Sequence, residues 1–79
     1  MAIESTNNWE VKNYDHKESK ITDHTLIVFD LYNGDELRTH IDWEVPSELI
    51  LNDPEQFEVF YQHRINQAKS DWLMEQDNG

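Results

Sequence analysis

The sequence predicts an α+β fold: a three-stranded antiparallel β-meander packed on one face by a long C-terminal α-helix. Three observations support this prediction. Stretches of alternating or β-branched residues fill much of the first 45 positions, as strands require. The pair Asn33-Gly34, a strong hairpin signal, separates two of these stretches. After Asp53, apolar residues recur at helical spacing.

Three strands are expected. The first covers residues 9–16, which alternate loosely between apolar and polar side chains. The second, residues 20–32, contains the β-branched and aromatic run 26–29 and should be central. The third, residues 37–45, alternates cleanly between apolar and polar side chains, so one of its faces should be exposed to water, and we call this the wet face. Its buried face would hold Leu37, Thr39, Ile41, Trp43 and Val45, and its wet face Arg38, His40, Asp42 and Glu44.

Two registers are open for the hairpin at Asn33-Gly34. A two-residue turn would pair Tyr32 with Asp35. A three-residue turn with Gly34 in the left-handed conformation would pair Leu31 with Asp35. Burial favours the second register, because a one-residue slip moves every side chain to the other face of the sheet. That register gathers on one face Ile27, Phe29, Leu31, Leu37, Ile41 and Trp43.

The helix is expected from Asp53 to about Glu75. Pro46 ends the third strand, and residues 47–51 form either one helical turn or an extended crossover. Asp53 can cap the helix, and Pro54 suits its first position. At 3.6 residues per turn the face toward the sheet would carry Phe57, Phe60, Tyr61, Ile65, Ala68 and Trp72.

Size and composition indicate a single small acidic domain over residues 1–79, with residues 1–8 and 76–79 frayed. The chain has no cysteine, which excludes disulfides and cysteine-based zinc sites. No secretory signal and no apolar run long enough to span a membrane is visible. We therefore expect a cytoplasmic protein, in the host cytoplasm if a phage encodes it, with no membrane partner.

The net charge of −11 is concentrated in one stretch of the sequence. Residues 30–58 contain nine acids and one base, Arg38, and so carry −8 of the −11. Such a charge repels nucleic acid and attracts basic surfaces. The nine acids are the candidate partner-binding residues: Asp30, Asp35, Glu36, Asp42, Glu44, Glu48, Asp53, Glu55 and Glu58.

Four side chains are candidate apolar anchors for a complex, because interfaces need such anchors besides charge. Tyr14 and Tyr32 are expected on sheet faces that the helix does not cover. Val59 and Leu73 fall nearly opposite the apolar stripe of the helix, which also makes a homodimer possible.

Catalysis and metal binding find no support in the pattern. The four histidines lack the spacing of a metal site, and no Gly-rich phosphate loop or nucleophile elbow is present. We therefore predict no enzyme activity, no catalytic residue, no metal and no cofactor. The charge also argues against direct nucleic-acid binding, because the chain has six basic residues and seventeen acidic ones.

By size and composition the chain resembles the small acidic inhibitors of bacteriophages and mobile elements, which include DNA mimics, anti-restriction and anti-CRISPR proteins. The resemblance implies an inhibitor that binds the basic, nucleic-acid-contacting surface of a host protein, such as a nucleoid-associated protein, a nuclease or a CRISPR effector. Two alternatives stay open. One is an immunity protein or antitoxin for a single basic toxin, and the other is a small adaptor domain whose charge plays no role.

Overall fold

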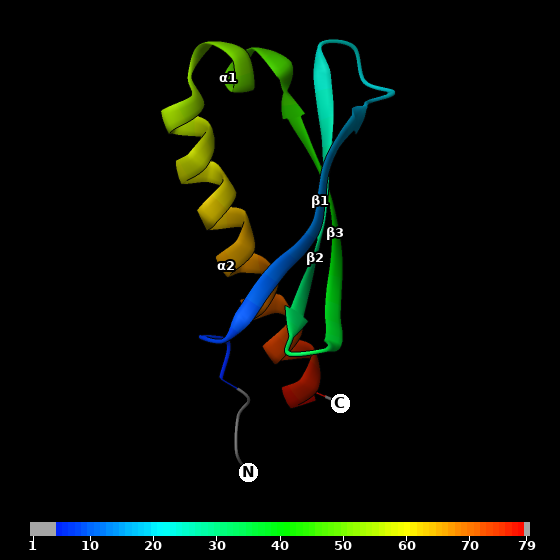
Figure 1. Ribbon diagram of the computed structural model, residues 1–79, viewed down its shortest axis with the longest axis vertical. Helices are drawn as coiled ribbons and strands as arrows, with labels where there is room; N and C mark the ends of the chain where they lie inside the picture. Colours follow the sequence, from blue (N-terminus) through cyan, green and yellow to red (C-terminus); the bar gives the residue numbers. More distant parts are fainter. Residues whose placement is uncertain (1–4, 79) are drawn as a thin grey trace.

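The computed structural model describes residues 5–78 and shows three strands followed by a short and a long helix (Figure 1). The predicted α+β class is confirmed. The expected fraying of residues 1–8 and 76–79 falls partly outside the described residues, and α2 continues beyond the expected end at Glu75. The elements are β1 (Trp9–Glu18), β2 (His24–Asn33), β3 (Glu36–Pro46), α1 (Ser47–Asn52) and α2 (Pro54–Asn78).

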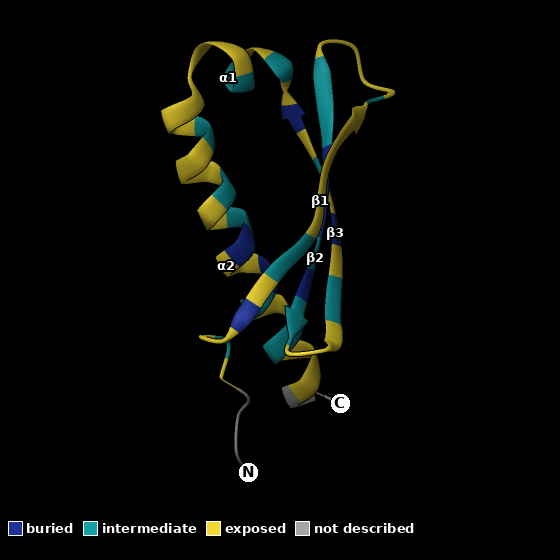
Figure 2. Ribbon diagram, in the orientation of Figure 1, coloured by how far each residue is buried: buried dark blue, intermediate teal, exposed yellow. Residues whose placement is uncertain are grey.

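The strands form one antiparallel sheet in the order β1-β2-β3, and α2 lies across one of its faces (Figure 1). We call the face away from α2 the open face. The central strand β2 contains three consecutive buried residues, 27–29, because it has a neighbour on each side (Figure 2). The core between sheet and helix consists of Trp9, Ile27, Phe29, Leu31, Ile41, Val45, Ile65 and Ala68.

The start of α2 follows the local chemistry of its first residues. The Asp53 carboxylate accepts a hydrogen bond from the backbone N–H of Gln56 at 3.2 Å. The Asp53 carbonyl accepts another from the N–H of Phe57 at 3.0 Å. Pro54 occupies the first helical position, where its missing N–H costs nothing. The segment before it is the helical turn α1, and not an extended crossover.

The boundary between β1 and β2 lies later than expected. β1 continues to Glu18, and β2 begins only at His24. Between them a turn is held by hydrogen bonds from the Ile21 N–H to the Ser19 hydroxyl at 2.9 Å and from the His24 N–H to the Ile21 carbonyl at 3.2 Å. The polar residues 16–19 therefore belong mostly to a strand, and residues 20–23 do not.

A bulge in β1 changes the face on which Tyr14 lies. Asn13 and Tyr14 together oppose Phe29, because the β1–β2 pairing shifts by one residue there. Asn13 is left-handed, with φ of 59°, a conformation that asparagine tolerates well. The expectation that the helix leaves Tyr14 uncovered is therefore wrong. Its ring lies 6.4 Å from Phe29 and meets Tyr61 of α2 edge-on at 5.5 Å, between centroids.

Both registers considered for the second hairpin are wrong. Asn33 pairs with Glu36 across a two-residue turn, in which Gly34 has φ of 64°. The pairing then shifts by one residue, since Tyr32 pairs with Leu37 but the preceding Leu31 pairs with Thr39. Beyond this shift Phe29 pairs with Ile41, and Ile27 with Trp43. The expected grouping of these four side chains on the helix side is confirmed.

This second shift places Arg38 on the helix side of the sheet and Leu37 on the open face, the reverse of the expected arrangement. Leu37 pairs with Tyr32 and is 53% exposed, so its expected place in the core is wrong. The Arg38 guanidinium lies 5.1 Å from the centroid of the Trp72 ring, on the helix side and not on the wet face. A cation over an indole face stabilises this arrangement, and the Arg38 stem covers apolar surface.

The face of α2 that packs on the sheet is narrower than predicted at its start and wider at its end. Ile65 and Ala68 are buried as expected, but Phe60 is 45% exposed, so its predicted burial is wrong. At about 100° per residue, Phe60 falls at the edge of the helix face that carries Ile65 and Ala68. Leu73, expected nearly opposite the packed face, is half-buried. The ring of its neighbour Trp72 meets that of Trp9 edge-on at 5.3 Å, so the start of β1 covers this part of α2.

Candidate partner-binding surface

The nine candidate acids do not form one surface. Asp35 and Glu36 lie at the β2–β3 turn, which is at the opposite end of the molecule from α1 (Figure 1). The longest dimension is 44 Å, so the charge of the stretch is divided between distant places. Three acids, Asp30, Asp42 and Glu44, lie on the open face, and four, Glu48, Asp53, Glu55 and Glu58, lie on α1, at the α1–α2 junction and on the first turns of α2.

On the open face, carboxylates are interleaved with cationic and hydrogen-bonding groups. The Asn13 amide donates to one Asp30 oxygen at 2.8 Å. The other Asp30 oxygen lies 2.5 Å from Nδ1 of His40, and Nε2 of His40 lies 2.8 Å from Asp42. His40 thus bridges two carboxylates, and this face is less negative than a count of its acids indicates.

These contacts change the pKa values of His40 and Asp30. Hydrogen bonds to Asp30 and then to Asp42 raise the pKa of His40, because the imidazolium can donate to both carboxylates. Hydrogen bonds from Asn13 and His40 lower the pKa of Asp30. A protonated His40 compensates part of the negative charge at the centre of the open face.

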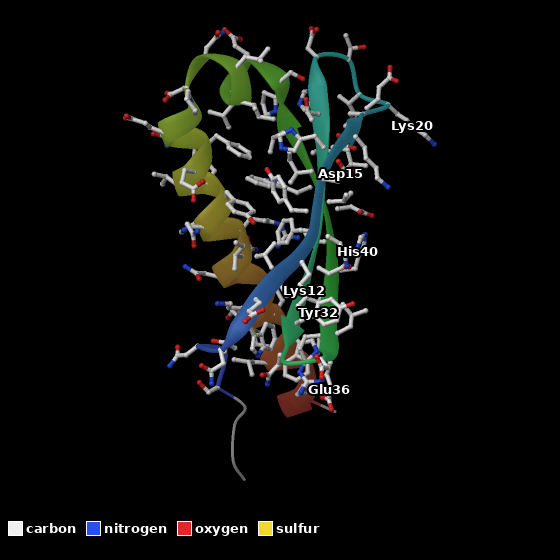
Figure 3. All side chains as sticks on the ribbon, in the orientation of Figure 1. Lys12, Asp15, Lys20, Tyr32, Glu36 and His40 are labelled. Atoms are coloured by element: carbon white, nitrogen blue, oxygen red, sulfur yellow. The ribbon has the colours of Figure 1, made fainter. Side chains whose placement is uncertain are left out.

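Two other side chains on the open face also contact neighbouring residues. Tyr32 lies on this face as expected, half-buried, with the Lys12 ammonium 4.8 Å from its ring centroid (Figure 3). The Ser19 hydroxyl donates to the carboxylate of Glu44. The role of Tyr32 as an anchor remains a prediction.

The acidic corner, which we define as Glu48, Asp53, Glu55 and Glu58, differs from the open face. All four acids are exposed, in a part of the chain where most of α1 and the first turns of α2 are exposed (Figure 2). Residues 47–61 include no lysine, arginine or histidine. The carboxylate of Glu58 accepts a hydrogen bond from the Gln62 amide at 3.4 Å. Burial, followed by the charge of Glu58, raises the pKa of Tyr14, so the corner extends to the ring of Tyr14, which contacts Phe29 and Tyr61.

Apolar side chains lie exposed within the same segment as the acidic corner. Val59 is 59% exposed, as expected for an anchor candidate. Leu51 is 78% exposed and Phe60 45%, and neither was identified as an anchor from the sequence. The sequence signal that could have identified Leu51 as an exposed apolar residue is its position two residues before Asp53, the cap of α2. Phe60 was assigned to the core because its helical spacing includes it in the apolar stripe, although only at the edge of that stripe.

Two hollows lie between β3 and α2. The upper hollow has a volume of about 450 Å³, and Leu49 of α1 is one of the residues that line it. The lower hollow has a volume of about 190 Å³. Arg64 lines both. The upper hollow is lined by Trp43, Glu44, Val45, Pro46, Leu49, Phe60, His63, Arg64 and Gln67, and the lower by Thr39, His40, Ile41, Arg64, Ala68, Asp71, Trp72 and Glu75.

No group of three His, Asp or Glu side chains in the described part of the chain is arranged to hold a metal ion. Within residues 5–78, neither helix combines the length and apolar character needed to cross a membrane. No protein-family model, curated protein or solved structure matches this chain.

Proposed function

We propose that this protein is a small acidic inhibitor that binds the basic, nucleic-acid-contacting surface of another protein. The observation that carries the proposal is the acidic corner. It combines four exposed carboxylates, no cationic side chain in residues 47–61, and the exposed apolar groups of Leu51, Val59 and Phe60. Carboxylates meet the same lysine and arginine groups that bind phosphates. The apolar groups supply the contacts that slow dissociation.

Geometry refines the proposal that the sequence suggested. The open face carries compensating charges from Lys12 and, when protonated, His40, whereas the acidic corner has none within residues 47–61. The corner is therefore the principal anionic contact of the proposed complex. Long-range attraction from the net charge of −11 would speed association with a basic partner, and salt would slow it.

The first experiment is a pull-down from bacterial lysate with the full chain as bait, eluted in rising salt and identified by mass spectrometry. We expect several nucleic-acid-binding proteins that salt releases and that DNA displaces. A single dedicated basic partner would instead indicate an immunity protein or antitoxin. Retention that salt does not affect would indicate an adaptor domain whose charge plays no role.

The second experiment locates the contact. The variant Glu48→Gln, Glu55→Gln, Glu58→Gln removes three charges from the corner and keeps Asp53 as the helix cap. We expect its association with the captured partner to be slower by roughly tenfold, because electrostatic steering is lost. The measurement is the association rate at low and high salt.

The matched control is Glu10→Gln, Asp35→Asn, Glu75→Gln. It removes three exposed charges away from the corner, including one from the acidic stretch 30–58. We expect a much smaller effect. Equal losses in both triple variants would show that only net charge matters and that the corner is not the contact.

A further inference from the structure

The free edge of β3 is the longest regular strand edge in the described chain. Thr39–Pro46 pairs with β2 without interruption, and the sheet order places no strand on the other side of β3 within residues 5–78. The other edge, β1, is interrupted by the bulge at Asn13 and Tyr14. Bulges disrupt the pairing of an edge with another chain, whereas a regular edge leaves backbone N–H and C=O groups ready to pair.

Both hollows open onto this edge. Residues 43–46 line the upper hollow and residues 39–41 the lower one. Consecutive residues in a strand point to opposite faces, so a hollow that touches several in succession borders the strand edge itself. The helix side of the edge therefore offers space for the side chains of an added strand.

The two sides of the edge differ in chemistry. On the open face, the carboxylates of Asp42 and Glu44 occupy alternate positions and are exposed, although His40 contacts one oxygen of Asp42 and Ser19 donates to one oxygen of Glu44. On the helix side the upper hollow is formed largely by apolar groups, including Trp43, Val45 and Phe60. An added strand would therefore need basic residues on one face and apolar residues on the other, in alternation.

A second copy of this chain does not have that chemistry. Antiparallel pairing of two β3 strands about a twofold axis near Asp42 would set carboxylates of the two copies against each other. Like charges directly opposite each other destabilise a strand pair. Joining two chains of charge −11 adds further repulsion.

We propose that the β3 edge receives an extended segment of the basic partner, which adds a fourth strand to the sheet. Its lysine or arginine side chains lie over Asp42 and Glu44, and its apolar side chains enter the upper hollow beside Phe60. Backbone pairing gives affinity, and the alternating side chains give specificity. This proposal rests on the proposed function, since it specifies the kind of segment that a basic partner presents.

The probe is an acetylated and amidated peptide of about eight residues that alternates lysine and valine, a length that matches the regular edge. We expect its binding to shift the backbone amide NMR signals of residues 39–46. Two further versions carry N-methyl groups on one or the other alternate set of backbone nitrogens. Only the set that faces β3 should weaken binding, by about tenfold or more, because only that set donates hydrogen bonds to the edge.

Two protein variants test the side-chain contacts. Asp42→Asn with Glu44→Gln should weaken peptide binding several-fold by removing the partners of the lysines. Phe60→Ser should also weaken it, whereas Met74→Ser, at an exposed apolar residue of the same helix outside both hollows, should not. Equal effects of the two N-methylated peptides, or signal shifts away from β3, would overturn the proposal.

The corner variant Glu48→Gln, Glu55→Gln, Glu58→Gln separates this proposal from the proposed function. It should still bind the peptide at β3 with at most a modest loss. If basic partners are captured through the corner but the peptide does not contact β3, the strand-addition proposal fails and the proposed function stands. Sedimentation that shows a dimer formed through β3, which excludes the peptide, would reassign the edge to a second copy.

Discussion

His40 is the residue whose environment differs most from what its place in the sequence indicates. It looks like a solvent-exposed histidine on a wet strand face, and its side chain is 53% exposed. Yet Asp30 and Asp42 lie on opposite sides of its ring, at 2.5 Å and 2.8 Å. Pairing across the strands produces this arrangement, since Asp30 lies directly opposite His40 on β2.

The raised pKa of His40 predicts a pH-dependent contribution to stability. A histidine with a higher pKa in the folded state stabilises the fold below its unfolded pKa of about 6.5 and loses this effect as pH rises through the folded value. Because the side chain is half-exposed, we expect a contribution below about 1 kcal/mol. His40→Gln should therefore lower the free energy of unfolding at pH 5.5 but hardly at pH 9, as measured by urea denaturation.

The control for this experiment is His63→Gln, because His63 is exposed on α2 and away from both carboxylates. The lowered pKa of Asp30 acts in the opposite sense. Its stabilisation is present above the ordinary carboxyl pKa and is lost as pH falls through the lower, folded value. Equal destabilisation by His40→Gln at both pH values would contradict an ionic role and indicate packing alone.

At the scale of elements, the strands, the hairpin position and the capped helix could be predicted because each depends on local chemistry. The two bulges could not. Alternation assumes one residue opposite one residue, and neither Asn13 nor Arg38 breaks the pattern visibly. Tertiary contacts select them, since the bulges bring Tyr14 onto Phe29 and Arg38 onto Trp72. The division of the nine candidate acids between separate places could not be predicted for a similar reason, because the acidic stretch 30–58 passes around both ends of the sheet.

Phe29 and Leu37 together test the register that the bulge in β3 produces. Sequence alternation alone assigns both residues to the same core. Phe29→Ala should cost about 3–5 kcal/mol, because Phe29 is fully buried. Leu37→Ala should cost no more than about 0.5 kcal/mol, because Leu37 is exposed on the other face. Thermal and urea unfolding measure both.

Phe29→Ala could remove most of the stability of so small a domain. Phe29→Leu, a milder change at the same position, keeps the comparison measurable. A loss from Leu37→Ala as large as that from Phe29→Leu would show that the observed register is wrong.

At the scale of the whole molecule, a charge of −11 on a body of 44 × 24 × 23 Å makes self-repulsion part of the energetics. The acidic regions at the two ends lie further apart than a Debye length at physiological salt, so at that salt most of the repulsion acts within each region, and at low salt it also acts between them. Salt should therefore stabilise the free protein while weakening its complexes with basic partners.

We expect the thermal midpoint to rise by roughly 4 °C or more, equivalent to about 1 kcal/mol, between about 20 mM and about 300 mM sodium chloride. The corner variant, with three fewer charges, should start higher and rise less. Differential scanning calorimetry measures both proteins. A midpoint that falls with salt would mean that the ion pairs outweigh the repulsion.

Each strand of the sheet is hydrogen-bonded only to strands next to it in the chain, and this order bears on how the protein folds. Short loops close at low entropic cost, so β1, β2 and β3 can pair as two hairpins soon after they are synthesised. The contact of Trp9 with Trp72 has to wait, because it closes a loop that includes nearly the whole domain. During synthesis, Trp9 at the start of the first strand gains its indole neighbour only after residue 72 has left the ribosome.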